Sequence, residues 1–329
     1  MDEQGRVRSW FQRNGGRFGM SGAPVVCRAV LNLGGFTNRS FTLGDGRVRL
    51  HLKLAGSGQA PLPWRWMDVQ QVLEAEYRSP RLLGVVEGGV IAGEALGLVF
   101  EHIPGHALHP RRDRRVLTEV LALAARLHRD TTLGGRLGAA ARGVRTCAAD
   151  LLETYVERFR ADMLSVAPVA AALDFLPADF PTWARSHTDA LEAAAAGGAF
   201  AVPATAVVHG DFHAGNVLVG GDGRWWVLDW DDLHARGDGM LDVTNLMRAQ
   251  ILRGEGDELL AAYAQAAGDP AGAGRVALYR RAMLLDEIID SLADYVAAEA
   301  LPQHRAAVRA IKRTAHLEAM ALYRREFAE

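Results

Sequence analysis

The stretch VVHGDFHAGNVLVGGDGRWWVLDWDD, from Val207 to Asp232, surrounds two short apolar runs with polar and charged side chains. The runs, Val217 to Val219 and Trp225 to Leu228, are separated by the turn signal GGDG. Two such runs joined by a glycine-rich turn predict a β-hairpin. A hairpin returns the chain to the end from which it left, so we expect Asp229 to come back to the end of the strands where Asn216 lies.

The segment before the hairpin, HGDFHAGN, places Asp211 five residues before Asn216. A loop of this length, bending at Ala214 and Gly215, can direct a carboxylate and an amide into one site. With Asp229, three oxygen-bearing side chains are then expected together. One carboxylate and one amide carbonyl suit Mg²⁺, which completes its ligand shell with phosphate oxygens and water. The spare carboxylate, Asp211, can accept a proton.

The same residues form the pattern of kinase active sites. There an Asp positions the substrate hydroxyl, a following Asn binds metal, and an Asp after a hairpin holds Mg²⁺ on the nucleotide phosphates. HGDFHAGN stands in place of the protein-kinase motif H-R-D-x-x-x-x-N, and VLDWDD in place of D-F-G. In these motifs the chain resembles the aminoglycoside phosphotransferase and choline kinase family of small-molecule kinases. The resemblance implies that Asp211 is the catalytic base, that Asn216 and Asp229 are metal ligands, and that His209 is a buried support of the loop.

A kinase also binds a nucleotide, and the sequence upstream offers the parts for this. In LGGFTNRSF, Gly34 and Gly35 lie where the resemblance places the flexible loop over the phosphates. The alternating segment RVRLHLKL predicts a half-buried strand, and its Lys53 matches the phosphate-contacting lysine of the family. Lys53 and Lys312 are the only lysines among 37 basic residues, and a compact ammonium is not interchangeable with a guanidinium at phosphates.

Two further parts of the nucleotide site follow from the resemblance. The family pairs its lysine with a glutamate on the next helix, and the segment WMDVQQVLEAEY offers Asp68, Glu74 and Glu76 without a register that selects one. The segment LVFEHIPG resembles the hinge between the two lobes. There, backbone groups from Glu101 to Ile103 would bond the adenine.

The fold class expected from these elements is α+β, with the two lobes of a protein-kinase-like fold. A chain of 329 residues exceeds the size at which a single core stops growing, about 250 to 300 residues. Residues 1–104 are expected to form a small, mainly β, nucleotide-binding lobe that ends in the hinge. Residues 105–329 are expected to form a larger, mainly helical lobe with the catalytic hairpin and the acceptor site, because helical periodicity dominates there.

The composition of the chain excludes several classes of binding partner and of cellular location. The net charge is only −2, without the basic surplus of a nucleic-acid-binding protein. No apolar run approaches the roughly 20 residues of a membrane span, and the charged N-terminus lacks the apolar core of a signal peptide. Cys27 and Cys147 form neither a disulfide framework nor a zinc cluster. We therefore expect a cytoplasmic enzyme, a monomer or small homo-oligomer, that uses ATP or GTP with Mg²⁺ and a small-molecule acceptor.

The helical C-terminal region contains the residues from which we infer the chemistry of the acceptor. The segment LLDEIIDSLADY carries four acidic residues on roughly one helix face: Asp286, Glu287, Asp290 and Asp294. An acidic stripe favours a cationic acceptor, although such stripes are also commonly paired with arginines. Trp230 offers aromatic surface to a sugar or a quaternary amine. The expected reaction is transfer of the γ-phosphoryl group to a hydroxyl of an aminoglycoside, amino alcohol or sugar.

Two other functions are compatible with the same residues. His209, Asp211 and His213 alternate and could face one transition metal, as in a metal hydrolase. The second alternative is a nucleotide-binding protein of the same fold without transferase activity. The missing glutamate partner of Lys53 favours it, and the complete set of Asp211, Asn216 and Asp229 disfavours it.

Overall fold

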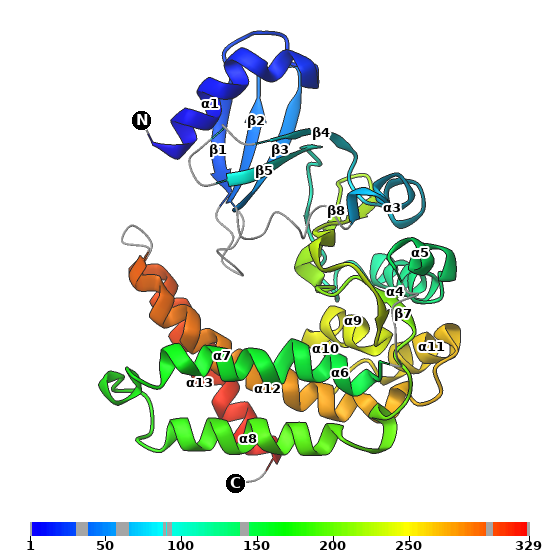
Figure 1. Ribbon diagram of the computed structural model, residues 1–329, viewed down its shortest axis with the longest axis vertical. Coiled ribbons are helices and arrows are strands. Elements are labelled where there is room, and N and C mark those ends of the chain that lie inside the picture. The colour runs from blue at the N-terminus through cyan, green and yellow to red at the C-terminus, as the bar shows by residue number, and fades with distance from the viewer. Residues whose placement is uncertain are drawn as a thin grey trace. The chain divides into compact units, whose positions relative to one another are not determined.

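The computed structural model describes residues 2–30, 39–56, 66–87, 90, 94–138, 145–300 and 305–327, and Figure 1 shows its backbone. The chain divides into two compact units. The first unit comprises Met1–Leu117, Gly135–Leu137 and Ala214–Leu233, and the second comprises Thr118–Gly134, Gly138–His213 and His234–Glu329. An N-terminal antiparallel sheet is followed by a mainly helical region, so the predicted α+β class is confirmed. The lobe boundary at residue 104 stays a prediction.

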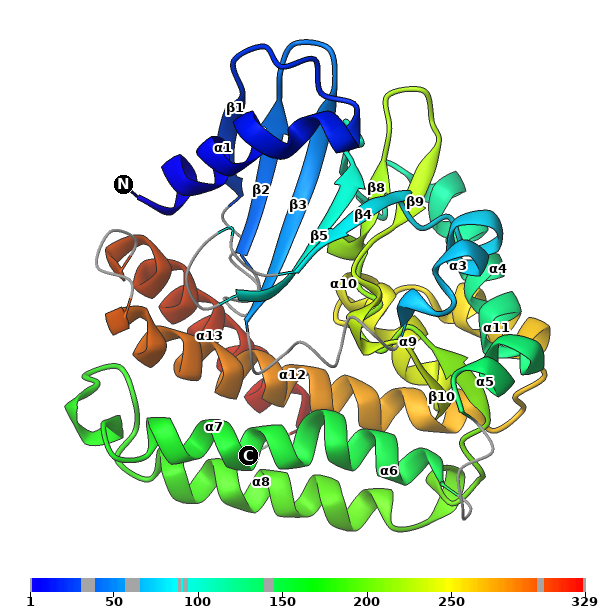
Figure 2. The same ribbon diagram turned by 45° about the horizontal axis from the view of Figure 1, so that its top comes forward.

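The first unit is built on a five-stranded antiparallel sheet with the strand order β1-β2-β3-β5-β4. The strands are β1 (Val26–Val30), β2 (Arg39–Gly44), β3 (Arg49–Gly56), β4 (Leu82–Val86) and β5 (Glu94–Glu101). The segment Gly44–Gly46 contains two glycines and joins β2 to β3, where Leu43 pairs with Leu50. Helix α1 (Glu3–Asn14) runs along this sheet in Figure 2 and contacts β1.

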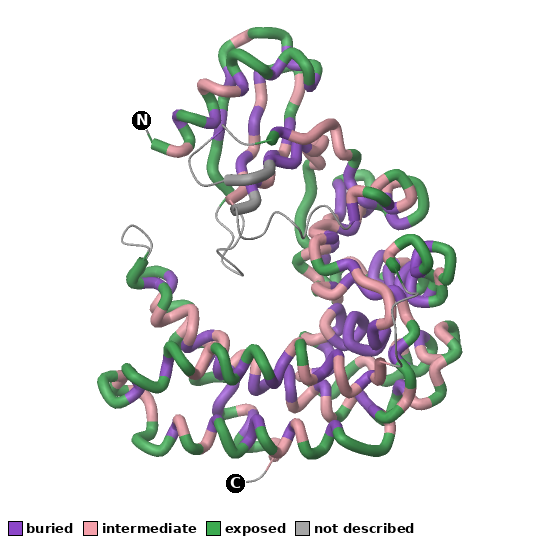
Figure 3. The backbone as a smooth tube through the Cα atoms, viewed as in Figure 1, coloured by how far each residue is buried: buried purple, intermediate pink, exposed green. Residues whose placement is uncertain are grey.

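Strand β3 has one apolar face and one polar face, as its alternating sequence predicts. Leu50, Leu52 and Leu54 are fully buried in a core that includes Val7 and Phe11 of α1. Figure 3 shows buried positions alternating with less buried ones along β2 and β3. Because successive side chains of a strand point to opposite faces, the odd-numbered residues of β3 lie on the side away from this core.

The predicted hairpin is present in the first unit. Strands β8 (Val217–Val219) and β9 (Trp225–Val227) pair antiparallel, and β6 (His106–Ala107) adds a third strand beside β8. Helix α3 (Gln70–Tyr77) ends next to it, where the Arg78 carbonyl accepts a hydrogen bond from the Val227 N–H at 3.0 Å. The hairpin is thus fixed to the segment that leads into β4.

The second unit is mainly helical and is organised around the long helix α12 (Gly272–Ala297), which contacts α7, α8, α9 and α13. Figures 1 and 2 show α7 and α8 running side by side. Further helices with described bounds are α4 (Arg114–His128), α5 (Thr131–Arg136), α6 (Cys147–Leu151), α7 (Glu157–Val166), α8 (Phe180–Ala195), α9 (Gly239–Leu246), α10 (Arg248–Ile251), α11 (Asp257–Ala267) and α13 (Arg305–Phe327).

Short elements complete the chain. A π-helical turn, Leu152–Val156, joins α6 to α7. Strands β7 (Ala206–Val208) and β10 (His234–Gly237) form a two-stranded antiparallel sheet in the second unit. The 3₁₀ turns are Gly15–Phe18, Ala170–Ala172, Gly198–Phe200, Ala214–Asn216, Trp230–Asp232 and Ala298–Ala300.

Within the part of the chain that the structure describes, no helix combines the length and the apolar character needed to cross a bilayer.

Candidate active site

Lys53 of β3 is held between two carboxylates of the segment that follows β9. Its Nζ donates to Asp229 Oδ1 at 2.5 Å and to Asp231 Oδ2 at 2.7 Å. The Lys53 side chain is only 12% exposed. Burial by itself would lower the pKa of Lys53, but the charges of Asp229 and Asp231 outweigh it, so that the pKa is raised. Lys53 is therefore a permanent ammonium in this cluster.

The partner of Lys53 is thus not one of the three acids of the helical segment that follows it. Asp68 and Glu76 are exposed, and Glu74 Oε1 accepts the Leu82 N–H at 2.6 Å. The two carboxylates that bond Lys53 come from VLDWDD instead. Asp231 was missed by the sequence argument, although its place two residues after Asp229 is a usable signal.

Asp231 is fixed from its other side as well. Its Oδ1 accepts the Nε1–H of Trp66 at 3.2 Å, and the indole of Trp66 stacks on Phe100 of β5 with a centroid distance of 6.1 Å. Asp231 is 13% exposed at its side chain, whereas Asp229 is 36% exposed. Asp231 is therefore mainly a buried partner of Lys53, and Asp229 is the carboxylate that solvent or a ligand can reach.

The backbone at Asp229 is left-handed, with φ +60° and ψ +65°. This region is uncommon for a residue other than glycine, although aspartate enters it more easily than most. The left-handed conformation of Asp229 changes the direction of the chain after β9 and directly precedes the 3₁₀ turn Trp230–Asp232. Trp230 itself is 3% exposed, and its Nε1–H donates to the Val227 carbonyl at 3.0 Å. The turn carries Asp229 and Asp231 to one lysine and places the intervening indole in the core.

Asn216 lies at the start of the same hairpin, as the last residue of the turn Ala214–Asn216. Its carbonyl accepts the N–H of Leu228 at 2.8 Å. The hairpin therefore returns the residue before Asp229 to Asn216, as its sequence predicted.

His51 was not among the predicted site residues. It lies two residues before Lys53 on β3, and therefore on the same side of the sheet. Burial and the positive charges of His102 and Lys53 lower the pKa of His51 to about 4. A neutral imidazole thus accompanies the Lys53 ammonium at neutral pH.

The segment around Asp211 belongs to the second unit and follows β7. Asp242 of α9 holds its backbone, because Asp242 Oδ2 accepts the His209 N–H at 2.7 Å and Oδ1 accepts the Gly210 N–H at 3.0 Å. Gly210 has φ +88°, a conformation that glycine adopts without strain. The Asp211 N–H in turn donates to His209 Nδ1 at 3.3 Å.

The side chains of this segment differ in exposure. His209 is fully buried, whereas Asp211 and His213 are each 47% exposed at their side chains. His213 Nε2 lies 3.6 Å from Asp211 Oδ2. The segment is not a strand, so His209 and His213 do not share a strand face, which was the basis for placing both on one transition metal. Among the described residues, no group of three or more His, Cys, Asp or Glu is arranged to hold a metal ion.

Asp242, which supports the segment, is buried and ionised. Its Oδ2 also receives a hydrogen bond from His128 Nε2 of α4, at 3.0 Å. Burial would raise the pKa of Asp242, but the hydrogen bond from His128, together with the bond from the His209 N–H, lowers it. The loop that carries Asp211 is therefore tied to a charged carboxylate.

The acidic stripe of α12 is present in the second unit, and cations accompany it. The pairs are Asp286 with Arg158 and Arg248, Glu287 with Arg248, and Asp290 and Asp294 with Lys312. Burial and the neighbouring carboxylate of Asp286 raise the pKa of Asp290 to about 6. The stripe is thus partly neutralised by residues of α7, α10 and α13.

The remaining predicted nucleotide contacts lie at the end of β5 and before β2. The Glu101 N–H donates to the Arg81 carbonyl at 3.0 Å, and the His102 N–H donates to the Arg49 carbonyl at 3.3 Å. Ile103 follows directly and is partly buried. Gly34 and Gly35, the predicted phosphate loop, lie outside the described residues.

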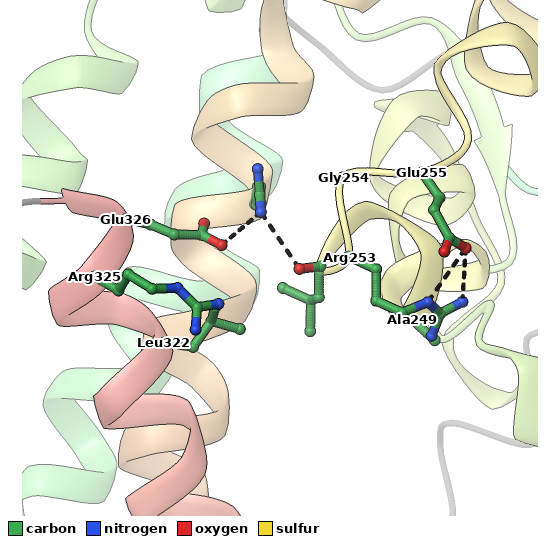
Figure 4. Close-up of a pocket in the computed structure, with 9 residues that line it drawn as sticks. Ala249, Arg253, Gly254, Glu255, Leu322, Arg325 and Glu326 are labelled. Carbon is green, nitrogen blue, oxygen red and sulfur yellow. Dashed lines mark hydrogen bonds and ion pairs between the residues drawn. The ribbon is translucent and has the colours of Figure 1, made fainter.

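A pocket of about 680 Å³ lies elsewhere in the second unit, between the loop after α10 and helices α12 and α13 (Figure 4). Its charged lining is largely paired, Arg280 with Glu326 at 2.6 Å and Arg253 with Glu255 at 3.2 Å. None of the predicted site residues lines it.

Comparison with known proteins identifies the chain. The model of the phosphotransferase enzyme family matches residues 29–284. The chain belongs to this family. The resemblance that the motifs HGDFHAGN and VLDWDD carry is therefore confirmed. No protein of curated function matches the phosphotransferase chain significantly by sequence.

Solved structures of the same fold include aminoglycoside and choline kinases. A thermostable mutant of aminoglycoside phosphotransferase APH(4)-Ia, in a ternary complex with AMP-PNP and hygromycin B, is 16% identical over 98% of this chain and 99% of its own, with a TM-score of 0.57. The GDP complex of wild-type aminoglycoside 2'-phosphotransferase-IIIa is 11% identical over 90% and 92%, with a TM-score of 0.54. Choline kinase LicA from Streptococcus pneumoniae is 15% identical over 90% and 95%, with a TM-score of 0.54. These likenesses establish a phosphotransferase fold.

Proposed function

We propose that this phosphotransferase transfers the γ-phosphoryl group of ATP or GTP to a hydroxyl group of a small molecule. The observation that carries the proposal is the cluster of Lys53, Asp229 and Asp231 on the polar side of β3. One ammonium and two carboxylates leave this cluster with a net negative charge. A divalent cation reverses that charge and makes the cluster complementary to phosphate oxygens. In this proposal, residues up to 104 bind the nucleotide and later residues supply the acceptor site.

The donor set fits Mg²⁺. Asp229 keeps 36% of its side chain exposed while one oxygen bonds Lys53. Asn216 lies at the same end of the hairpin strands, because its carbonyl accepts the N–H of Leu228, the residue before Asp229. A carboxylate and an amide oxygen are hard ligands of the kind Mg²⁺ uses when phosphate and water complete its shell. When bound, the ion would neutralise charge on the phosphates. Asn216 and Asp229 would hold it, and Lys53 would contact the phosphates directly.

Asp211 fits the role of the base. Its carboxylate is about half exposed, while its backbone segment is fixed through Asp242. The hydroxyl oxygen of the acceptor would form a bond to the γ-phosphorus as the bond to the bridging oxygen breaks. The hydroxyl proton would pass to Asp211, and the nucleoside diphosphate would leave. Such a reaction gains its rate mainly from positioning and charge neutralisation.

The nucleotide contacts of the sequence analysis are part of the proposal. Gly34 and Gly35 would approach the phosphates through their backbone, and backbone groups from Glu101 to Ile103 would bond the base. The known complexes with GDP and AMP-PNP belong to relatives of the same fold, and they support a purine nucleotide as the donor.

We propose a cationic acceptor, an aminoglycoside or another amino alcohol. Five carboxyl groups gather at α7 and α12 against three cations: Asp162, Asp286, Glu287, Asp290 and Asp294 against Arg158, Arg248 and Lys312. Asp162 Oδ2 is buried without a hydrogen-bond partner, and burial raises the pKa of Asp162. An ammonium group of the acceptor would relieve this surplus. A buried Trp230 would then shape the core beneath the hairpin rather than contact the acceptor.

The proposal is tested by supplying purified protein with Mg²⁺ and ATP or GTP and measuring diphosphate release over aminoglycosides, amino alcohols and sugars. Turnover with an amine-bearing acceptor supports the proposal. Stabilisation by nucleotide without turnover on any acceptor favours the binding protein without transferase activity. Stoichiometric zinc, iron or manganese in protein purified without added metal would favour the metal hydrolase.

A further inference from the structure

A buried chain of hydrogen bonds extends from α11 to the segment that carries Asp211. The hydroxyl of Tyr263 lies 2.5 Å from His128 Nδ1, and His128 Nε2 lies 3.0 Å from Asp242 Oδ2. Asp242 then accepts the backbone N–H groups of His209 and Gly210. Every side chain of this relay is nearly inaccessible, with exposures of 4% for Tyr263, 6% for His128 and 0% for Asp242.

When the His128 imidazole is neutral, the protons in this relay have one consistent arrangement. An ionised carboxylate only accepts, so His128 Nε2 must carry the hydrogen that reaches Asp242. Burial and the charge of Asp242 raise the pKa of the Tyr263 hydroxyl, which therefore keeps its proton and donates to Nδ1. With the opposite tautomer, a lone pair of Nε2 would face the carboxylate of Asp242. The Tyr263 hydroxyl thus selects the tautomer that supports Asp242.

Gly239 provides the space for this relay. A Cβ atom at residue 239 would lie 2.6 Å from His128 Nδ1 and 2.6 Å from the Tyr263 hydroxyl. Such contacts are shorter than real Cβ atoms make, so a larger residue would separate the two groups. Glycine at position 239, which has no side chain, allows His128 and Tyr263 to approach each other closely at this point.

We propose that Tyr263 is a positioning residue for Asp211. By donating to His128 it fixes the Nε2–H tautomer, which orients Asp242 to hold the backbone of His209 and Gly210 directly before Asp211. This inference rests on the proposed function of Asp211 as the base. The role is distinct from packing, because the aromatic ring of Tyr263 could pack without its hydroxyl.

The test replaces only that hydroxyl, as Tyr263→Phe, and compares it with a matched control. Tyr323→Phe removes an equally buried hydroxyl that bonds another histidine, His187 Nδ1, at 2.7 Å. Both variants lose a buried Tyr–His hydrogen bond, but only Tyr263 is connected to Asp242. We expect Tyr263→Phe to lower kcat about tenfold, the factor that corresponds to one buried hydrogen bond, with the KM for nucleotide unchanged. Tyr323→Phe should leave kcat unchanged.

A second measurement does not depend on activity. Hydrogen exchange at the His209 and Gly210 amides should be faster in Tyr263→Phe and unchanged in Tyr323→Phe, because local opening is no longer opposed by an oriented Asp242. Nitrogen-15 shifts of His128 should show the Nε2–H tautomer in the parent protein. Equal exchange and equal kcat in the two variants would overturn the inference. If the parent protein shows no turnover, the proposed function is refuted. Faster amide exchange in Tyr263→Phe would in that case still support the role of Tyr263 in fixing the backbone before Asp211.

Discussion

Lys53 Nζ lies 2.5 Å from Asp229 Oδ1, which joins residues 176 positions apart in the sequence. The contact is possible because the strand β3 turns its leucines into the core and its lysine outward, while the left-handed Asp229 ends the second hairpin strand at the same place. Asp231 completes the pair from the following turn. In the proposed site, the contact of Lys53 with these two carboxylates positions the groups that would face the nucleotide phosphates.

Lys53→Met should lower kcat/KM by about 100-fold or more, the loss typical of a removed electrostatic contact to the reacting group. It also leaves Asp229 and Asp231 without their cation. Arg305→Met is a suitable control, because it removes a cation that pairs with Glu299 at a 50% exposed side chain. Steady-state kinetics with varied nucleotide concentration measure the effect. A Lys53→Met enzyme with the parent kcat/KM would remove Lys53 from the donor site.

Asp229 and Asp231 should respond differently to substitution, because Asp229 is the more exposed of the two. We expect Asp229→Asn to raise the Mg²⁺ concentration for half-maximal activity at least about tenfold, in the range of losses seen when metal sites are altered. Asp231→Asn should change it less, and should act mainly on stability through Lys53 and Trp66. Titration of activity with Mg²⁺ compares the variants. Equal Mg²⁺ dependence in both would contradict the assignment of Asp229 as the ligand.

The pKa of Asp290 gives a pH dependence of stability with a definite sign. The pKa is raised to about 6, against about 3.9 in an unfolded chain. The native state therefore binds more protons than the unfolded state between about pH 4 and pH 6, and stability falls as pH rises through this window.

Asp290→Asn should remove this fall, so that the variant is more stable than the parent at pH 7.5 and similar to it at pH 4. The gain should stay below about 1 kcal/mol, because the side chain is 40% exposed. Urea unfolding at both pH values measures it, and Asp174→Asn, at an 85% exposed side chain, serves as the control. A parallel pH profile for parent and Asp290→Asn would contradict the interpretation.

The sequence predicted the parts that depend on local patterns. Strict alternation in RVRLHLKL determined which face of β3 carries Lys53, and two apolar runs around GGDG determined the hairpin that brings Leu228 back to Asn216. Both are short-range consequences of a period of two and a tight turn. The fold class followed from them together with the helical periodicity of the later chain.

The side-chain partners could not be predicted because they are long-range contacts. Asp68, Glu74 and Glu76 were equivalent on periodicity, and nothing local indicated that Asp231 and Trp66 would meet at Lys53. The relay through His128 and Tyr263 joins α4 to α11 across 135 residues. The cations that pair with the stripe of α12 also come from three other helices, which one helix's pattern cannot specify.

The central claim is that Asp211 is the base of a phosphotransferase, and Asp211→Asn tests it most directly. The measurement is phosphate transfer to an amine-bearing alcohol, followed by mass spectrometry of the acceptor, with nucleotide affinity measured on the same samples and Asp222→Asn as an exposed control. The account predicts phosphorylated acceptor from the parent and the control, and none from Asp211→Asn despite parent-like nucleotide binding. Transfer at the parent rate by Asp211→Asn would contradict it.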